Sequence, residues 1–140
     1  LHTHSQFSVL QATAKVSAIV QRVVDDDQPA IGITDIGNMM GAFQFIKAVS
    51  DYNRTRLDGV KELKAIIGYE AYLCRNRGDK NQKDDGYQIP LLAKNKVGYH
   101  NLARLSSAAY IEGFYYVPRI DRNVLLENKE GLNSPLLPFL

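Results

Sequence analysis

The stretch Leu1-His2-Thr3-His4-Ser5-Gln6-Phe7-Ser8 sets the expectation for both the fold and the site. Two imidazoles spaced two residues apart on an extended chain leave the backbone on the same side, which is a chelating geometry. If Leu1 ends a strand, His2 and His4 project at its carboxyl end, where parallel α/β folds place their chemistry. The pair alone leaves two interpretations open. It is either a metal site or two histidines that each find a hydrogen-bond partner on a sheet face.

The composition is that of one ordinary globular domain. The 140 residues are 45% hydrophobic and 23% charged, which is enough for one core of moderate size. Seventeen basic and 15 acidic residues leave a net charge of +2, so composition alone does not indicate a nucleic-acid or membrane surface. The single cysteine, Cys74, excludes an internal disulfide and a cysteine-based zinc cluster.

The expected location is cytoplasmic, with no membrane partner. No apolar run approaches the ~18 residues of a membrane span, and no signal-peptide pattern opens the chain. The chain starts on Leu1, without an initiator methionine and inside an apparent strand. We therefore expect it to be a segment of a longer protein.

The pattern of the first half of the chain predicts a helix, a strand and a second helix. Thr13 is a suitable N-cap for a helix with an apolar stripe of Val16, Ile19, Val20, Val23 and Val24. Asp25-Asp26-Asp27 and Pro29 end that helix. The run Ala30–Ile33 suits a buried parallel strand. Residues 39–52 return to helical spacing, with apolar positions at Met39, Phe43, Ile46 and Val49.

A second strand is predicted over residues 63–74, and it carries Glu70 in its middle. Charged side chains are seldom buried unless they are paired or coordinate a cation. Glu70 is therefore either a cation ligand or a carboxylate that faces a lysine or arginine or lies at the wet end of the strand. Both interpretations stay open at this point.

Residues 75–86 are polar and of mixed charge, and we interpret them as a mobile loop. Phosphate binding by the basic residues of the loop is an alternative, but its interleaved aspartates cancel much of their field. Tyr87–Ala93 then has the pattern of a strand, and Pro90 indicates either an edge strand or a strand that begins at that residue. Two successive strands around a loop depart from strict alternation of strands and helices.

The last third predicts a helix after Gly98 with Leu102, Leu105 and Ala109 on one face, ended by Gly113. His100 is then a surface residue at the start of that helix. Residues 114–120 suggest a short aromatic strand, and Asp121 suits the cap of a further helix. For Tyr115 and Tyr116, packing at the rim of the core is favoured over stacking on nucleic-acid bases.

This alternation predicts an α/β architecture of parallel type. A complete barrel takes at least ~200 residues, so the chain supplies roughly half of one or a locally rearranged version.

Six stretches together carry a resemblance to a known family. In chain order they are His2-Thr3-His4-Ser5-Gln6-Phe7-Ser8, Ala30-Ile31-Gly32-Ile33-Thr34-Asp35-Ile36-Gly37-Asn38, Ile67-Gly68-Tyr69-Glu70-Ala71-Tyr72, Leu91-Leu92-Ala93-Lys94-Asn95, Gly98-Tyr99-His100-Asn101-Leu102 and Pro118-Arg119-Ile120-Asp121. The series resembles the amino-terminal polymerase-and-histidinol-phosphatase (PHP) domain of the bacterial replicative DNA polymerase III alpha subunit. The resemblance covers residues 1–132 and leaves residues 133–140 as an unassigned tail.

The resemblance implies a distorted (βα)7 TIM-like barrel, of which this chain covers roughly the amino-terminal half. In metal-binding members, a cleft at the carboxyl ends of the strands holds divalent ions and hydrolyses phosphoesters, including a 3′-terminal nucleotide. His2 and His4 match the first ligand pair of those members, and Glu70 matches a ligand carboxylate.

Three positions depart from the ligand pattern of the family. Gln11 stands where ligand-bearing relatives have aspartate, and Ile36 and Gln88 stand where they have histidine. Isoleucine offers no lone pair, and a glutamine lacks the charge that offsets the desolvation of a divalent cation. We therefore expect no polynuclear site. His2, His4 and Glu70 form either one weak zinc or manganese site or a hydrogen-bonded remnant, and the charge argument favours the remnant.

Three functions compete on this basis. They are a structural and interaction domain of a DNA polymerase, a metal-dependent 3′-5′ exonuclease, and a free-standing phosphatase of the same superfamily. The stretches from Gly98 and from Pro118, which match the polymerase, argue against the phosphatase, and Gln11, Ile36 and Gln88 argue against the exonuclease. We expect the first function, with no catalytic residues in this segment. The implied partners are the rest of the alpha subunit, a proofreading exonuclease subunit and, through the parent chain, DNA. The parent polymerase, a magnesium-dependent nucleotidyltransferase, has its active site outside this segment.

Overall fold

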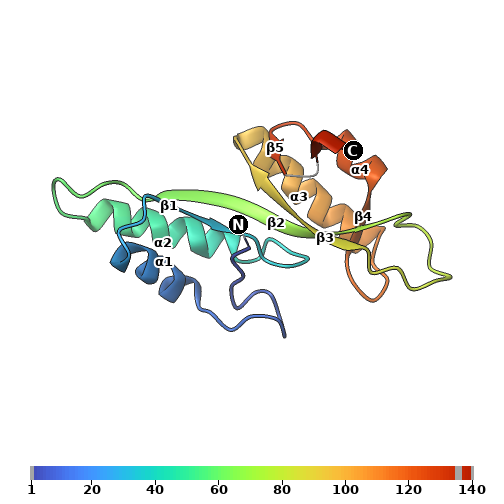
Figure 1. Ribbon diagram of the computed structural model, residues 1–140, viewed down its shortest axis with the longest axis horizontal. Helices are drawn as coiled ribbons and strands as arrows, with labels where there is room; N and C mark the ends of the chain where they lie inside the picture. Colours follow the sequence, from blue (N-terminus) through green and yellow to red (C-terminus); the bar gives the residue numbers. More distant parts are fainter. Residues whose placement is uncertain (1, 135–136, 140) are drawn as a thin grey trace.

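The computed structural model describes residues 2–134 and 137–139 (Figure 1). Over these residues the chain is a mixed α/β protein. Its elements, in chain order, are α1 (Val16–Asp25), β1 (Ala30–Ile33), α2 (Ala42–Thr55), β2 (Lys64–Cys74), β3 (Tyr87–Ala93), α3 (Lys96–Ile111), β4 (Arg119–Asp121), α4 (Arg122–Glu127), β5 (Leu132–Asn133) and the 3-10 turn η1 (Leu137–Phe139).

Strand β2 is the centre of the sheet and runs through both halves of the molecule (Figure 1). On one edge, β1 pairs with its first residues and β4 with its last, both in parallel. On the other edge β3 pairs antiparallel with β2, and β5 continues antiparallel beyond β3. The predicted departure from strict alternation around residues 75–86 is therefore confirmed. Pro90 lies in the part of β3 that, among the described residues, pairs only with β2, so its missing N–H disrupts no ladder.

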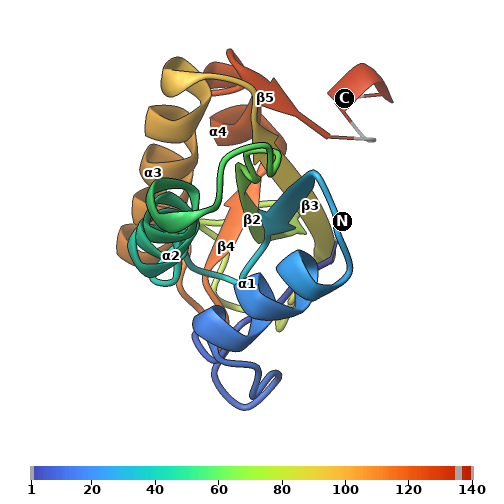
Figure 2. The same cartoon turned by 90° about the vertical axis from the view of Figure 1, so that its left-hand side faces the viewer.

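Helices α2 and α3 lie on the same side of the strands in Figure 2. The apolar stripe of α1 is confirmed, because its buried residues are Val16, Val20 and Val23. The predicted cap at Thr13 is wrong. Lys15 occupies the N-cap position, and its side chain makes no capping hydrogen bond.

Helix α2 begins later than predicted and turns a different face to the core. Its buried residues are Ala42, Phe45 and Val49, which lie at i, i+3 and i+7. Phe43, predicted as a core position, is 76% exposed, whereas Phe45 is fully buried. The difference follows from the starting residue, because counting from Met39 selects the neighbouring stripe of the helix.

The predictions for the last two helices are largely confirmed. Helix α3 buries Leu102, Leu105 and Ala109, and His100 lies on its exposed side. The Asp121 side chain caps α4 by accepting from the Val124 N–H. Burial acts to raise the pKa of Asp121, but hydrogen bonds from the Val124 N–H and from Arg77 outweigh it, so this pKa lies below its ordinary value.

The aromatic strand suggested over residues 114–120 is confirmed only for Arg119 and Ile120. The regular strand β4 begins only at Arg119, and the preceding residues contribute one isolated bridge between Tyr115 and Val117. Tyr116 adopts a φ of 63°, in the left-handed region, so the chain turns there. Tyr116 is 64% exposed, whereas the Arg119 side chain is fully buried.

We predict that Phe45→Ala lowers the free energy of unfolding by about 3 to 5 kcal/mol, because it leaves a cavity between α2 and the sheet. The matched control, Phe43→Ala on the exposed face of the same helix, should change it by less than ~0.5 kcal/mol. Urea denaturation followed by circular dichroism measures both values. Equal effects of the two substitutions would contradict the assigned face of α2.

Candidate metal site and its hydrogen-bond network

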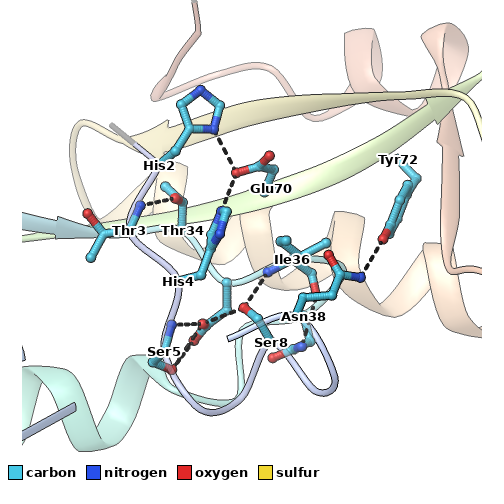
Figure 3. A network of polar contacts seen from close by, with 12 residues as sticks. His2, Thr3, His4, Ser5, Ser8, Thr34, Ile36, Asn38, Glu70 and Tyr72 are labelled. Atoms are coloured by element: carbon cyan, nitrogen blue, oxygen red, sulfur yellow. Dashed lines mark hydrogen bonds and ion pairs between the residues drawn. The ribbon is translucent and has the colours of Figure 1, made fainter. Parts of the chain in front are cut away.

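His2, His4 and Glu70 come together at the centre of the molecule, as the sequence predicted (Figure 3). His2 Nδ1 lies 2.9 Å from Glu70 Oε2, and His4 Nε2 lies 2.8 Å from the same oxygen. The Glu70 side chain is only 3% exposed, whereas those of His2 and His4 are 57% and 24% exposed. The two imidazoles therefore cover a buried carboxylate from the solvent side.

The amino-terminal segment that carries the two histidines is not a strand in the described residues, and Leu1 lies outside them. The expectation that His2 and His4 end a strand is therefore wrong for the described part of the segment. Backbone contacts with the end of β1 hold it instead. The Thr34 N–H donates to the Thr3 carbonyl at 2.8 Å, and the Thr3 N–H donates to Thr34 Oγ1 at 3.1 Å.

Asp35 anchors the next part of the segment. Its Oδ1 accepts from the Ser5 N–H at 2.7 Å and from the Ser8 hydroxyl at 2.8 Å, and the Ser5 hydroxyl also donates to this carboxylate. Asp35 is 2% exposed. Gly41 is required beside it, because a Cβ there would lie 2.4 Å from Asp35 Oδ2. Sequence reasoning did not single out Asp35, although an aspartate two residues after a buried strand was a usable signal.

Glu70 is positioned by β2 and by the chain that leaves β1. The Glu70 N–H donates to the Asp35 carbonyl at 3.0 Å, and the Gly37 N–H donates to the Glu70 carbonyl at 2.9 Å. Ile36 therefore pairs directly with Glu70 in a parallel bridge. Paired residues of neighbouring strands share one face of a sheet, so the Ile36 side chain lies next to the carboxylate. It offers no lone pair there.

The two glutamines lie beside Tyr72, which is further along β2 than Glu70. Gln11 Nε2 donates to the Tyr72 hydroxyl at 3.2 Å, and Gln88 of β3 lies opposite Tyr72 in the register. Tyr72 shares the face of β2 that carries Glu70, because it is two residues away. The three departures from the family pattern thus lie on the face that holds the candidate site, but none of them supplies a charged ligand. Sequence reasoning missed Tyr72 as the partner of Gln11.

The donor set fits one divalent ion. Within the described residues, the only group of three or more potential ligands is His2, His4 and Glu70, whose ligand atoms lie within 4.8 Å of one another. Two imidazoles and a carboxylate are a known three-ligand set for zinc. Each imidazole nitrogen that faces Glu70 can donate a proton to it or offer a lone pair to a metal, and the two uses exclude each other. The geometry thus accommodates a hydrogen-bonded cluster or a single ion.

The Asp35 anchor generates a stability prediction. We expect Asp35→Asn to lower the free energy of unfolding by about 3 kcal/mol, because hydrogen bonds to a buried charged acceptor contribute ~1.5 to 3 kcal/mol each. The exposed control Asp58→Asn should change it by less than ~0.5 kcal/mol. Urea denaturation of both variants checks this, and an effect of Asp35→Asn no larger than that of the control would count against the anchor.

None of the helices in the described part of the chain is long and apolar enough to cross a membrane.

Comparisons with known proteins agree with the geometry. The family model described as PHP domain matches residues 1–134. DNA polymerase III subunit alpha of Thermus aquaticus is 44% identical over 139 residues, which cover 94% of this chain and 11% of that protein. The subunits of the same name from Borreliella burgdorferi and Chlamydia trachomatis are 40% and 41% identical over 136 residues. The chain spans about a tenth of the length of these curated relatives. It belongs to the PHP domain family.

Proposed function

We propose that this chain is the PHP domain of a DNA polymerase III alpha subunit, and that it acts in DNA replication as a structural and interaction module. Its similarity to relatives of that name, over nearly its whole length, supports the polymerase context. In this proposal the nucleotidyltransferase centre and its magnesium belong to the rest of the subunit. The boundary of the module at residue 132 stays a prediction.

For the complete fold, we propose a distorted (βα)7 barrel of which this chain forms roughly the amino-terminal half. Strands β1 and β4 are parallel to β2, as barrel strands are to their neighbours. The antiparallel strand β3 is the local distortion. Further strands would then complete the wall beside the described ones.

The position of Ile36 is the main observation that supports a module without nuclease activity. Phosphoester hydrolysis by two metals needs ions about 3.5 to 4 Å apart, with ligands that serve both. The residue paired directly with Glu70 is Ile36, which cannot ligate an ion. His2, His4 and Glu70 then remain as a hydrogen-bonded cluster that holds the amino-terminal segment on β2. If a zinc or manganese ion binds, these three residues would hold it, and it would supply a single Lewis acid.

A metal-dependent 3′-5′ exonuclease is the second candidate, and the convergence of His2, His4 and Glu70 favours it. We predict that the purified chain with added manganese or zinc leaves a 3′-labelled primer intact, because the two-metal mechanism of phosphoester hydrolysis needs a second ion to stabilise the leaving oxygen. Gel electrophoresis of the primer measures this. Metal-dependent shortening that His4→Ala abolishes, and that the exposed control His100→Ala preserves, would establish the exonuclease instead.

An apolar groove on the outer side of α3 supports the interaction role. Its volume is about 470 Å³, and it lies between residues 38–40 and α3. Ile111 and Met40 at this groove are 80% and 63% exposed. The inner face of α3 is already filled by the core, so these side chains are available for a partner. The small volume suits a short apolar segment of a separate subunit better than a whole domain. We assign the groove to the proofreading exonuclease subunit.

The docking assignment predicts that the exonuclease subunit is retained by the immobilised chain at micromolar concentration. Ile111→Glu should weaken retention at least tenfold, because it places a charge in an apolar contact. Leu57→Glu is the matched control, since Leu57 is 78% exposed and lies in the connection after α2. No retention at micromolar concentration would contradict docking. Equal retention by the wild-type chain and the Ile111→Glu variant would contradict the groove as its site.

A further inference from the structure

A large cleft lies away from the histidine cluster, at the end of β2. Its volume is about 920 Å³, and the walls come from the end of β2, the loop of residues 75–86 and the start of α4. We propose that this cleft binds single-stranded nucleic acid, through its phosphates and one stacked base. The proposal goes beyond the structural role, and it does not involve the candidate metal site.

In the sequence, the aspartates of the loop are evidence against phosphate binding. In the structure, Asp79 and Asp84 accept hydrogen bonds from backbone N–H groups of the same loop. The Asp84 carboxylate accepts from the Arg75 and Gly86 N–H groups at 3.1 and 3.0 Å. Asp79 Oδ1 accepts from the Asn81 N–H at 2.9 Å. These hydrogen bonds turn carboxylate oxygens toward backbone donors, although both aspartates still line the cleft. Their negative charge remains there, but its acceptor oxygens are engaged.

Four cationic side chains line the cleft against those two aspartates. They are Arg75, Lys83, Arg119 and Arg122. Arg75 is exposed, and Lys83 is 61% exposed in an ion pair with Asp85, whose side chain is 43% exposed. Such exposed pairs contribute little to stability, so a phosphate can replace Asp85 as the partner of Lys83 at small cost.

Arg119 adds a buried positive charge at the base of this cleft. Its guanidinium donates to the carbonyls of Gly113, Arg77, Asp79 and Asp84, at distances from 2.8 to 3.2 Å. None of the ion pairs among the described residues involves Arg119, and its side chain is fully buried. Neutral carbonyls satisfy the hydrogen bonds of a buried cation but do not cancel its charge. The field of Arg119 therefore favours an anion in the adjoining cleft.

Tyrosine rings beside the cations distinguish a nucleic-acid strand from a simple anion. Tyr87 lines the cleft and is 81% exposed. Tyr116 is 64% exposed, and the Lys83 ammonium lies 5.3 Å from its ring centroid. Exposed aromatic rings next to basic side chains are the usual platform for unpaired bases. A duplex keeps its bases stacked inside, so it could use the cations but not the Tyr87 ring.

A fluorescent 16-residue oligothymidylate, titrated with the 140-residue chain at several salt concentrations, tests the proposal by anisotropy. We expect binding with a Kd of about 1 to 100 μM. Arg75→Glu combined with Lys83→Glu should weaken binding at least tenfold. It should also make the logarithmic salt dependence less steep by about 1.4, because two phosphate contacts are lost. The charge-matched control, Lys15→Glu with Lys129→Glu, should keep the wild-type slope.

Tyr87→Leu tests the stacked base separately. It should weaken binding about tenfold while leaving the salt slope unchanged, because it removes a ring and no charge. Tyr110→Leu on α3, with a ring that is 43% exposed, is the control and should bind like the wild type. Circular dichroism shows that each variant is folded.

Three results would overturn the proposal. One is no binding by the wild-type chain at 100 μM protein and about 50 mM salt, where electrostatic binding is strong. Another is equal affinity for a duplex of the same length, because the ring would then have no role. The third is displacement of the oligonucleotide by micromolar thymidine triphosphate, which would indicate a nucleotide pocket and not a groove for a strand.

Discussion

The buried carboxylate of Glu70 is the constraint on which the rest of the structure depends. An ionised carboxylate in the middle of a central strand is costly unless donors or a cation compensate it. Here the compensation comes from His2 and His4, which lie 66 residues or more away in sequence. The amino-terminal segment must therefore cross to β2. The contacts of Thr3 with Thr34 and of Ser5 with Asp35 hold it in that position.

In the proposed function, the same arrangement is a former metal site that keeps its fold without catalysis. His2, His4 and Glu70 are the residues that the resemblance matches to ligands, and here both histidines make a hydrogen bond with Glu70. Ile36 next to Glu70 then removes the possibility of a second ion without disturbing the β-bridge, because that bridge uses only backbone atoms.

The sequence predicted regular elements well where periodicity was strong. The stripe of α1, the long strand around Glu70 and the cap at Asp121 are confirmed. The sequence did not predict which of two neighbouring faces of a helix is buried, or which groups satisfy a buried side chain. Phe43 and Phe45 are both apolar, and only the starting residue of α2 decides which one is buried. Arg119 could not be assigned to the interior, because three of the four carbonyls that accept its hydrogen bonds belong to a loop at least 35 residues away.

For the candidate site, the sequence and the family resemblance together identified His2, His4 and Glu70, which the structure brings together. They did not identify the anchor, because Asp35 acts through hydrogen bonds to Ser5 and Ser8 that depend on the three-dimensional path of the segment. Spacing along the chain carries no information on that path. The sequence did not show that Ile36 lies beside Glu70. The observed bridge between the two residues places it there.

The proposed function requires that the pocket at Glu70 does not assemble a cluster of ions. Anomalous diffraction from crystals soaked in zinc or manganese, recorded at the absorption edge of the metal, tests it most directly. The account predicts no peak or one peak, touching His2, His4 and Glu70. Two or more peaks at that carboxylate, about 3.5 to 4 Å apart, would contradict it.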